Sequence, residues 1–174
     1  MQIQTIMQDH AIGPIHMAAD GDTLLALEFG DLEHRLMPML RARFRKEPIC
    51  EPVDDLGDIT SAIHAYFKGD LHALDAIDID GGGTDFQRLA WQALRTIPPG
   101  DIRTYGQMAA ALSRPNAARA IGMANALNPI SLVVPCHRLV GSDGALTGYG
   151  GGIERKRWLL DHEQRHSSRS PRVR

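Results

Sequence analysis

The chain has 174 residues, 43% hydrophobic and 23% charged, which suits one globular domain with a core or two small ones. No apolar run approaches the roughly 20 residues of a membrane span, and the amino terminus lacks a basic region followed by an apolar stretch. Two cysteines make neither a disulfide framework nor a zinc-ligand spacing, so we expect a reduced cytoplasmic protein with no metal and no cofactor.

The net charge of −2 hides an asymmetry between the two halves of the chain. Residues 1–84 have six basic and fifteen acidic side chains, whereas residues 85–174 have thirteen basic and six acidic ones. A basic half is typical of a region that binds a polyanion such as nucleic acid. Opposite charges facing each other across a domain interface would explain the same counts. Residues 165–174 contain four arginines and no acid, and we expect a disordered basic tail there.

The first half, residues 1–80, is predicted to be a small α+β domain with a structural role. Alternating apolar residues between turn residues predict three strands, over 3–7, 15–19 and 23–29. Apolar residues about four apart predict two helices, over 31–45 and 58–68. Cys50 and the five histidines of this half have no ligand spacing, so we expect structural or surface roles for them. Three consecutive glycines, 81–83, end this half where the charge changes sign.

The second half, residues 84–164, is predicted to be mostly helical. Thr84 with Gln87, and Thr104 with Gln107, match the capping box, in which the two side chains bond the first free backbone N–H groups of a helix. Each box therefore predicts the start of a helix. Both helices are predicted to be short and to end at Pro- and Gly-rich or Ser- and Pro-rich breaks.

A third predicted helix, over 117–127, consists almost entirely of small side chains around Arg119. With the helix before it, it forms the short pair typical of a helix-turn-helix. A helix without bulky side chains can approach the narrow minor groove closely. Tight packing of the same helix in a core is the alternative.

The pattern with the clearest chemistry is VVPCHRL at 133–139, where Cys136 follows an apolar run and His137 and Arg138 come directly after it. A thiol attacks as thiolate, and nearby cationic groups favour that form. A buried cysteine that packs as a small hydrophobe is the alternative. The apolar run predicts a strand, in which neighbouring side chains point to opposite faces. Contact between Cys136 and His137 would then need a bend at Pro135 or a bridging water.

The order of these motifs resembles the O6-alkylguanine-DNA alkyltransferase family, also called methylated-DNA–protein-cysteine methyltransferases. The shared order runs from about Thr84 to Glu163: a helix-turn-helix, Asn-Pro, an apolar run, Pro-Cys-His-Arg, a glycine-rich turn and a terminal helix. This resemblance implies a winged helix-turn-helix-like DNA-binding motif in the second half. Over residues 1–83 the resemblance is weaker and implies an RNase H-like sheet-and-helix domain. The expected fold class is therefore α+β.

The function that the resemblance implies is direct reversal of DNA damage. The protein would flip O6-alkylguanine out of double-stranded DNA and transfer the alkyl group irreversibly, once per molecule, to Cys136. O4-alkylthymine is a second lesion of this type, and the sequence does not rank the two. We expect a monomer that does not associate with membranes.

The resemblance also implies roles for individual residues. Cys136 would accept the alkyl group, His137 would be linked to it through a water, and Glu163 would orient His137 as in a catalytic triad. Tyr105 would donate its hydroxyl hydrogen to guanine N3. The residues implied at the DNA interface are Arg119, which would fill the space left by the flipped nucleotide, Ala118, Gly122, Asn128, which would brace the turn before the active site, and Arg138. The residues implied around the lesion base are Leu139, Tyr149, Gly150 and Trp91.

Two other functions stay open at this point. A lesion-binding module would flip alkylguanine and transfer nothing, although relatives of that kind replace the cysteine that this chain keeps. A cysteine hydrolase built on Cys136, His137 and Glu163 would turn over a thioester or peptide without DNA. Taken singly, Tyr105 could cap a helix and Glu163 could form an ion pair with a neighbouring Lys or Arg.

Overall fold

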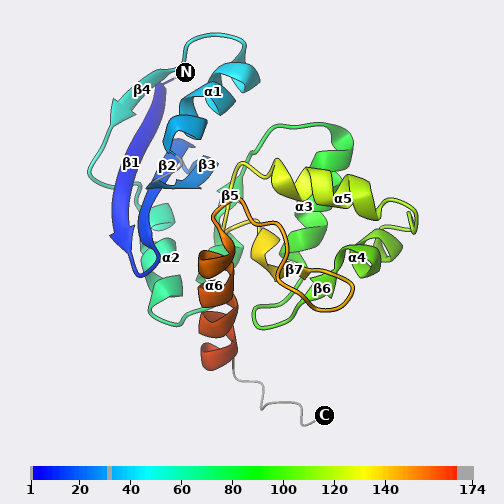
Figure 1. Cartoon of the computed structure of the whole chain (residues 1–174). Helices are drawn as coiled ribbons and strands as arrows, with labels where there is room; N and C mark the ends of the chain where they lie inside the picture. The colour runs from blue at the N-terminus through cyan, green and yellow to red at the C-terminus, as the bar shows by residue number, and fades with distance from the viewer. Residues whose placement is uncertain (1, 31–32, 168–174) are drawn as a thin grey trace.

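The structure is a computed structural model that describes residues 2–30 and 33–167. It has a sheet part with two helices, from the first half of the chain, and a helical part from the second half (Figure 1). The last helix, α6 (Ile153–His166), packs against the sheet part through ring contacts between His162 and Tyr66. The α+β class predicted from the sequence is confirmed at this level. No described helix is long and apolar enough to span a membrane.

The sheet part contains a mixed five-stranded sheet in the order β4-β1-β2-β3-β5. Its strands are β1 (Gln2–His10), β2 (Gly13–Asp20), β3 (Thr23–Phe29), β4 (Ile49–Pro52) and β5 (Asp78–Ile79). The first three pair antiparallel, whereas the edge strands β4 and β5 run parallel to β1 and β3. The three predicted strands are confirmed within β1–β3. The edge strands escape prediction because such short segments show no clear alternation.

Two helices cover opposite faces of the sheet: α1 (Glu33–Phe44) and α2 (Asp58–Phe67). Leu36 of α1 packs in a small cluster with Ile3 of β1. Ile63 of α2 belongs to a separate, larger cluster with Met17 of β2. Both predicted helices are confirmed, although the predicted start of the first, at residues 31–32, lies outside the described residues.

The helical part contains α3 (Asp85–Arg95), α4 (Tyr105–Ala111) and α5 (Ala118–Ala126), with a two-stranded parallel sheet of β6 (Arg103–Thr104) and β7 (Leu139–Val140). Both capping boxes are confirmed. The backbone N–H of Gln87 donates to Thr84 Oγ1 at 3.2 Å, and that of Gln107 donates to Thr104 Oγ1 at 3.1 Å. The Gln side chains accept from the Thr backbone N–H groups at 2.8 Å, which completes each box.

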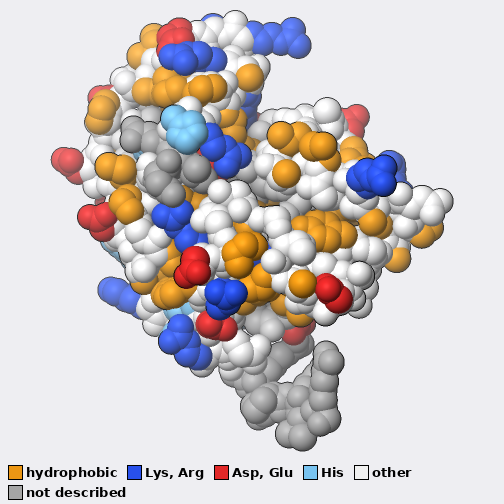
Figure 2. All heavy atoms as spheres, viewed as in Figure 1, with side chains coloured by type: hydrophobic (Ala, Val, Ile, Leu, Met, Phe, Trp, Pro, Cys, Tyr) orange, Lys and Arg blue, Asp and Glu red, His pale blue; other side chains and the backbone are white. Residues whose placement is uncertain are grey.

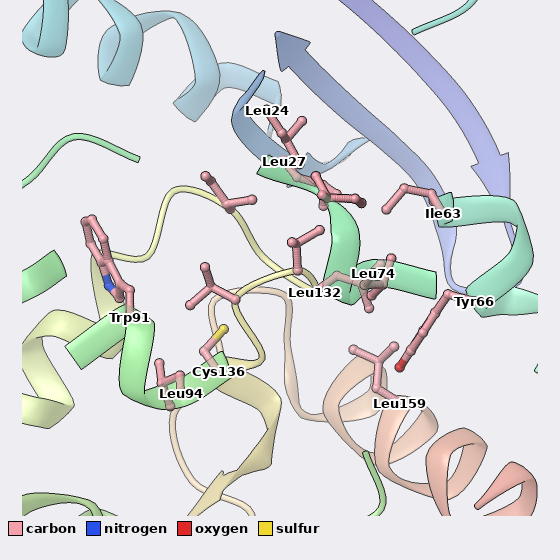
Figure 3. Packing of buried hydrophobic residues seen from close by; sticks show 14 of the residues in the cluster. Leu24, Leu27, Ile63, Tyr66, Leu74, Trp91, Leu94, Leu132, Cys136 and Leu159 are labelled. Carbon is pink, nitrogen blue, oxygen red and sulfur yellow. The ribbon is translucent and has the colours of Figure 1, made fainter. Parts of the chain in front are cut away.

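One buried cluster extends through both parts (Figure 3). It includes Leu24 from the sheet, Leu94 from α3 and Leu159 from α6, and Cys136 lies within it. Backbone hydrogen bonds from Leu27 N to Pro129 O and from Ser131 N to Leu27 O tie β3 to the segment before the cysteine. The domain division at residues 81–83 stays a prediction, and the sheet part supports the segment that holds the thiol.

The strand predicted before Pro135 is wrong. Leu132 is buried in the left-handed region, with a φ of 73°, and Val134 N donates to Ile130 O at 3.0 Å across the resulting turn. An inverse γ-turn follows at Pro135, with φ −79° and ψ 65°, closed by a hydrogen bond from Cys136 N to Val134 O. The apolar residues are therefore buried in a compact turn.

The predicted tail also needs a correction at its start. Residues 165 and 166 continue α6, and Ser167 N donates to Glu163 O at the helix end. The last turn is basic, which suits the negative end of the helix dipole. The rest of the predicted tail, residues 168–174, lies outside the described residues.

Candidate active site

Cys136 begins a short 3-10 helix, Cys136–Arg138, directly after the γ-turn. Proline has a fixed φ and no N–H, so Pro135 favours the sharp bend that ends the apolar turn. The same bend presents three consecutive functional side chains, of Cys136, His137 and Arg138, to buried surroundings. A bend at Pro135 was one of the two geometries expected from the sequence, and the structure contains it.

Asn128 braces this turn from the end of α5. Its amide nitrogen donates to Val134 O at 2.9 Å and to Cys136 Sγ at 3.2 Å, and its side-chain oxygen accepts from Ile130 N at 2.9 Å. The side chain thus holds both ends of the turn and also contacts the sulfur. Because Asn128 follows α5 directly, it fixes the thiol relative to the Ala-rich helix.

The Cys136 thiol is only 4% exposed, and burial raises its pKa to about 11. The hydrogen bond from Asn128 and the positive charge of Lys156 offset only part of this effect. A nearby cation therefore does favour the thiolate, as expected, but burial outweighs it, and in the free protein the protonated thiol predominates at neutral pH. The proton has to leave during the reaction, which requires a base nearby.

His137 and Glu163 form a fully buried pair. His137 Nε2 lies 2.8 Å from Glu163 Oε1. Burial lowers the pKa of His137, so its imidazole is neutral at pH 7. The ionised Glu163 accepts a hydrogen bond from Nε2–H of His137. The proton of the neutral imidazole is therefore on Nε2, and Nδ1 has a free lone pair that can accept a hydrogen bond. Within the described residues Nδ1 is buried and has no hydrogen-bond partner.

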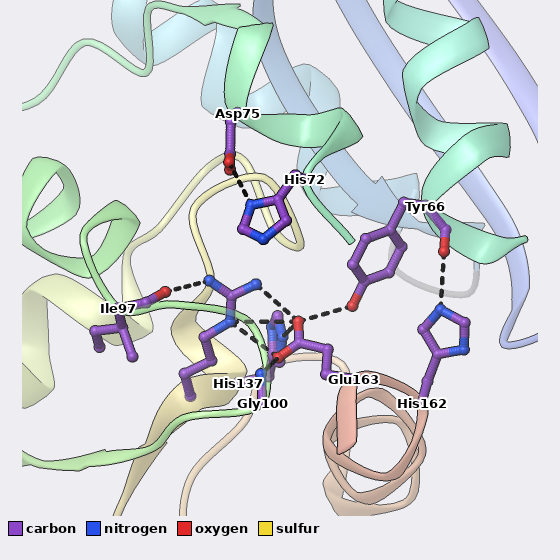
Figure 4. Close-up of polar contacts among 9 residues, drawn as sticks. Tyr66, His72, Asp75, Ile97, Gly100, His137, His162 and Glu163 are labelled. Carbon is purple, nitrogen blue, oxygen red and sulfur yellow. Dashed lines mark hydrogen bonds and ion pairs between the residues drawn. The ribbon is translucent and has the colours of Figure 1, made fainter. Parts of the chain in front are cut away.

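Glu163 is held by a larger set of donors than the sequence indicates (Figure 4). Tyr66 hydroxyl donates to Oε1 at 2.9 Å, Arg138 Nη2 donates to the same oxygen at 2.8 Å, and Gly100 N donates to Oε2 at 3.1 Å. Burial by itself would raise the pKa of Glu163, but His137 and Arg138 outweigh it and hold this pKa well below its usual range. Arg138 is always charged, so it keeps Glu163 ionised even when His137 is neutral.

The DNA-contact role predicted for Arg138 is corrected by this arrangement. Its side chain is 6% exposed and is occupied by Glu163 and by the carbonyl oxygen of Ile97. A guanidinium that is bonded on both sides inside the protein cannot reach a phosphate or base without breaking a buried ion pair. Arg138 therefore stabilises the carboxylate behind His137.

Tyr105 lies at the first position of α4, half-buried and close to the site. A Cβ built on Gly122 of α5 would lie 3.8 Å from the Tyr105 ring, an ordinary van der Waals distance, so the ring packs beside this position of the helix. Burial raises the pKa of Tyr105, partly offset by a hydrogen bond with Thr147. The phenol therefore keeps its proton at neutral pH and can act as a donor.

The loop of residues 147–152 lies against the sheet part. A Cβ on Gly151 would lie 2.3 Å from the buried Phe29 ring, and the Tyr149 ring meets Phe29 edge-on at 6.0 Å. The Tyr149 hydroxyl is buried with no hydrogen-bond partner among the described residues, and burial raises its pKa. Gly150 is exposed, and a Cβ there would lie 3.2 Å from Arg35 Nη1. The loop thus depends on close contact with β3.

The exposed face of α5 contains Arg119 and Met123, and Ala118 is half-buried. Arg119, Ala120 and Met123 line a surface groove together with Asn116. Figure 2 shows basic side chains beside hydrophobic ones over the region of α4 and α5. Arg119 therefore lies on the outside of the predicted helix-turn-helix, where a ligand can reach it.

Trp91 has a different place from the one predicted in the lesion pocket. It is buried, and its Nε1 donates to Ala124 O at 2.9 Å, which joins α3 to α5. A Cβ on Gly83 would lie 2.7 Å from the Trp91 ring, so the glycine segment packs on the indole. Leu139 is fully buried in β7, and its carbonyl oxygen accepts from Lys156 Nζ. Trp91 is therefore a core residue.

The sequence of this chain is similar to those of known DNA methyltransferases. The sequence profile described as "6-O-methylguanine DNA methyltransferase, DNA binding domain" matches residues 85–165. A methylated-DNA–protein-cysteine methyltransferase of Salmonella typhimurium is 46% identical over 155 residues, 87% of this chain and 90% of the relative. One of Mycobacterium tuberculosis is 44% identical over 163 residues, 94% and 92% of the two chains. The chain belongs to the methylated-DNA–protein-cysteine methyltransferases.

Solved structures agree with this family membership. The crystal structure of M. tuberculosis O6-methylguanine methyltransferase matches with a TM-score of 0.77 and 39% identity, over 97% of this chain and 96% of that one. The M. tuberculosis protein OGT in complex with DNA matches with a TM-score of 0.76 and 38% identity, over 96% and 95% of the two chains. The chain is therefore a methyltransferase enzyme, which rules out the two alternatives of a lesion-binding module and a hydrolase.

Two buried residues of this methyltransferase escape prediction from its sequence. Lys156 donates from Nζ to Thr147 O at 2.8 Å and also to Leu139 O, so it ties the 147–152 loop to β7. Its spacing of three and seven from Leu159 and Glu163 places it on the buried face of α6, a signal that the sequence offers. Tyr66 gives no such signal, because its partner lies 97 residues further along the chain. No group of three or more potential metal ligands is present in residues 2–30 and 33–167.

Proposed function

We propose that this protein repairs double-stranded DNA by transferring an alkyl group from O6-alkylguanine to Sγ of Cys136, once per molecule. The observation that carries the proposal is the PCHR turn, where a thiol held by Asn128 is followed by a histidine paired with a buried carboxylate. Sulfur forms a bond to the alkyl carbon as the bond from that carbon to guanine O6 breaks. The thioether has no route back to the thiol, so the protein acts as a stoichiometric reagent.

Activation of the thiol is assigned to His137. The neutral imidazole offers Nδ1 as an acceptor, and a water between this atom and Sγ would pass the thiol proton to it. The imidazolium that forms is stabilised by Glu163 at 2.8 Å. Because the pKa of Cys136 is about 11, little thiolate is present at neutral pH, and His137 has to take the proton for attack to proceed.

Departure of guanine is assigned to Tyr105. Charge develops on the purine ring as the bond to O6 breaks, and a phenol that keeps its proton can donate a hydrogen bond to N3. The backbone around Cys136 and Leu139 would hydrogen-bond the guanine edge. Tyr149 and Gly150, in the loop over the thiol, would close on the base.

DNA binding is assigned to α4 and α5 as a winged helix-turn-helix. The small residues Ala118 and Gly122 would let α5 approach the minor groove, and Arg119 would fill the space of the flipped nucleotide. Unstacking costs a few kcal/mol, and less for a mispairing base. We further infer an RNase H-like fold for the sheet part, a monomer in solution and a cytoplasmic location. O4-alkylthymine stays a second candidate lesion.

The experiment is transfer followed by mass spectrometry. The protein is mixed in excess with duplex DNA that contains one O6-methylguanine, and the peptide with Cys136 is weighed. The proposal predicts a gain of one methyl group on this peptide, and an endpoint of one methyl per protein when DNA is in excess. A Cys136→Ser variant should bind the duplex and gain nothing. Multiple turnover, or methylation elsewhere in the chain, would contradict the proposal.

A further inference from the structure

We propose that Tyr66, on α2 of the sheet part, is a positioning residue for alkyl transfer: its hydroxyl fixes the Glu163 oxygen that binds His137. The proposal rests on the function proposed above and extends it to the half of the chain for which the sequence suggests a structural role alone. Tyr66 is fully buried, and its hydroxyl donates to Glu163. Its action on the reaction is through Glu163.

The geometry makes Tyr66 part of a shared acceptor. Glu163 Oε1 accepts from Tyr66 hydroxyl at 2.9 Å, from His137 Nε2 at 2.8 Å and from Arg138 Nη2 at 2.8 Å. Tyr66, His137 and Glu163 are fully buried, so no solvent replaces a lost donor (Figure 4). Arg138 Nε also donates to this oxygen at 3.3 Å. The three residues that donate to it compete for its charge, and the loss of one strengthens the hold of Glu163 on the other two.

Tyr66 stays a donor over the whole working range of pH. Burial, together with the negative charge of Glu163, raises its pKa well above the ordinary value. Its hydroxyl therefore withdraws charge from Oε1 at every pH at which His137 is able to act. This limits how strongly Glu163 stabilises a proton on His137, and so keeps the imidazole free to accept the thiol proton.

The other groups that face His137 come from two elements. Glu163 and Lys156 belong to α6, and Arg138 belongs to the 3-10 turn of His137 itself. Tyr66 of α2 reaches His137 through Glu163 alone. Removal of the Tyr66 hydroxyl changes neither the charges of the α6 and turn residues nor the contacts of the thiol.

A matched control exists on the neighbouring residue. His162 Nε2 is hydrogen-bonded to the backbone carbonyl of Tyr66 at 2.8 Å, and the His162 ring stacks on Trp158 at 4.9 Å. His162→Phe removes a buried hydrogen bond between the same two helices and keeps the stack. It leaves the Glu163 carboxylate and its donors in place, so it separates loosening of the α2–α6 contact from the effect on Glu163.

The test is the rate of single-turnover methyl transfer to Cys136, measured between pH 5 and 9 for wild type, Tyr66→Phe and His162→Phe. Protonation of His137 stops it from accepting the thiol proton, so the rate falls on the acid side. Without the Tyr66 hydroxyl, Glu163 holds the His137 proton more tightly and the acid limb moves to higher pH by roughly half to one unit. On that limb the rate drops about threefold to tenfold relative to wild type.

The outcomes separate the two proposals. A Tyr66→Phe to wild-type rate ratio that is constant at all pH values overturns the positioning role, since a structural effect alone scales the folded fraction. An equal shift in His162→Phe also overturns it. Failure of the wild type to methylate Cys136 at any pH contradicts the proposed function instead.

If Tyr66→Phe does not fold, 3-fluorotyrosine at position 66 replaces it. Its stronger donor should shift the limb to lower pH, and an absent or upward shift overturns the proposal.

Discussion

Asn128 joins three groups of the turn: it accepts from Ile130 N, and it donates to the Cys136 sulfur and to Val134 O, which also accepts from Cys136 N. A turn that buries this much apolar surface leaves some backbone groups without partners, and a single amide side chain offers both a donor and an acceptor. The brace thus combines folding of the turn with placement of the nucleophile.

Replacing Asn128 by Ala should lower the free energy of unfolding by about 1–3 kcal/mol, because it leaves the buried N–H of Ile130 without its acceptor. It should also slow methyl transfer, since the sulfur loses the hydrogen bond that lowers its pKa. Urea unfolding and transfer rates measure both effects. Asn125→Ala is the control: the Asn125 side-chain oxygen is buried without a partner within the described residues. A loss there equal to that of Asn128→Ala would contradict the brace.

Replacing Arg119 by Ala tests the space-filling role. The side chain is exposed on α5, so stability should change by no more than about 0.5 kcal/mol. Repair of O6-methylguanine in duplex DNA should slow far more than attack on the free O6-methylguanine base, which needs no flipping. Rates on the two substrates give the comparison. Equal losses on both would show that Arg119 acts at the chemical step or on the fold.

The site is formed by the ends of helices and by the turns between them. Cys136 lies in a 3-10 turn, Tyr105 begins α4, Asn128 follows α5, and Glu163 lies near the end of α6. Such positions are set by packing of whole helices, so small shifts of one helix would move a catalytic group. The 147–152 loop is packed against β3 through glycine.

Gly151→Ala should displace this loop. The added methyl group would lie 2.3 Å from the Phe29 ring, which is fully buried and cannot yield. We expect stability to fall by up to about 3 kcal/mol and methyl transfer to slow, as the loop moves off β3. Gly148→Ala meets no atom within 4 Å, and its positive φ of 45° should cost only about 1 kcal/mol. Equal effects of the two variants on transfer would contradict a specific contact with Phe29.

Aromatic and histidine rings from both halves of the chain form a continuous series of contacts. His10 of β1 stacks on Phe67 of α2 at 4.6 Å, Phe67 meets Trp158 of α6 at 5.8 Å, and Trp158 stacks on His162. Burial is the main cause that lowers the pKa of His10 to about 4, and the neighbouring His64 adds to it. The contact between the sheet part and α6 therefore contains histidines that fold in the neutral form.

This series of contacts predicts a loss of stability in mild acid. Between pH 6.5 and about 4 the unfolded chain binds a proton on His10 that the folded protein excludes, so the free energy of unfolding falls as the pH drops through this window. His10→Phe keeps the stacking ring and should make the decline less steep. Urea unfolding at several pH values measures it, with His34→Gln, at an exposed position, as control. An unchanged slope in His10→Phe would contradict the prediction.

The three central strands and the helices with their capping boxes could be predicted from the sequence alone. Its resemblance to the family also pointed to a set of site residues whose roles stay predictions: Cys136, His137, Glu163, Tyr105 and Arg119. These predictions need only local sequence patterns and the order of motifs along the chain, so no knowledge of distant contacts is required. The three-dimensional packing was needed to show that the apolar run before Pro135 is a turn, that Arg138 is buried against Glu163, and that burial favours the protonated thiol. It alone brought Tyr66 to a carboxylate 97 residues away. Burial and long-range contact decide such properties, because desolvation and hydrogen bonding depend on which distant surfaces close over a group.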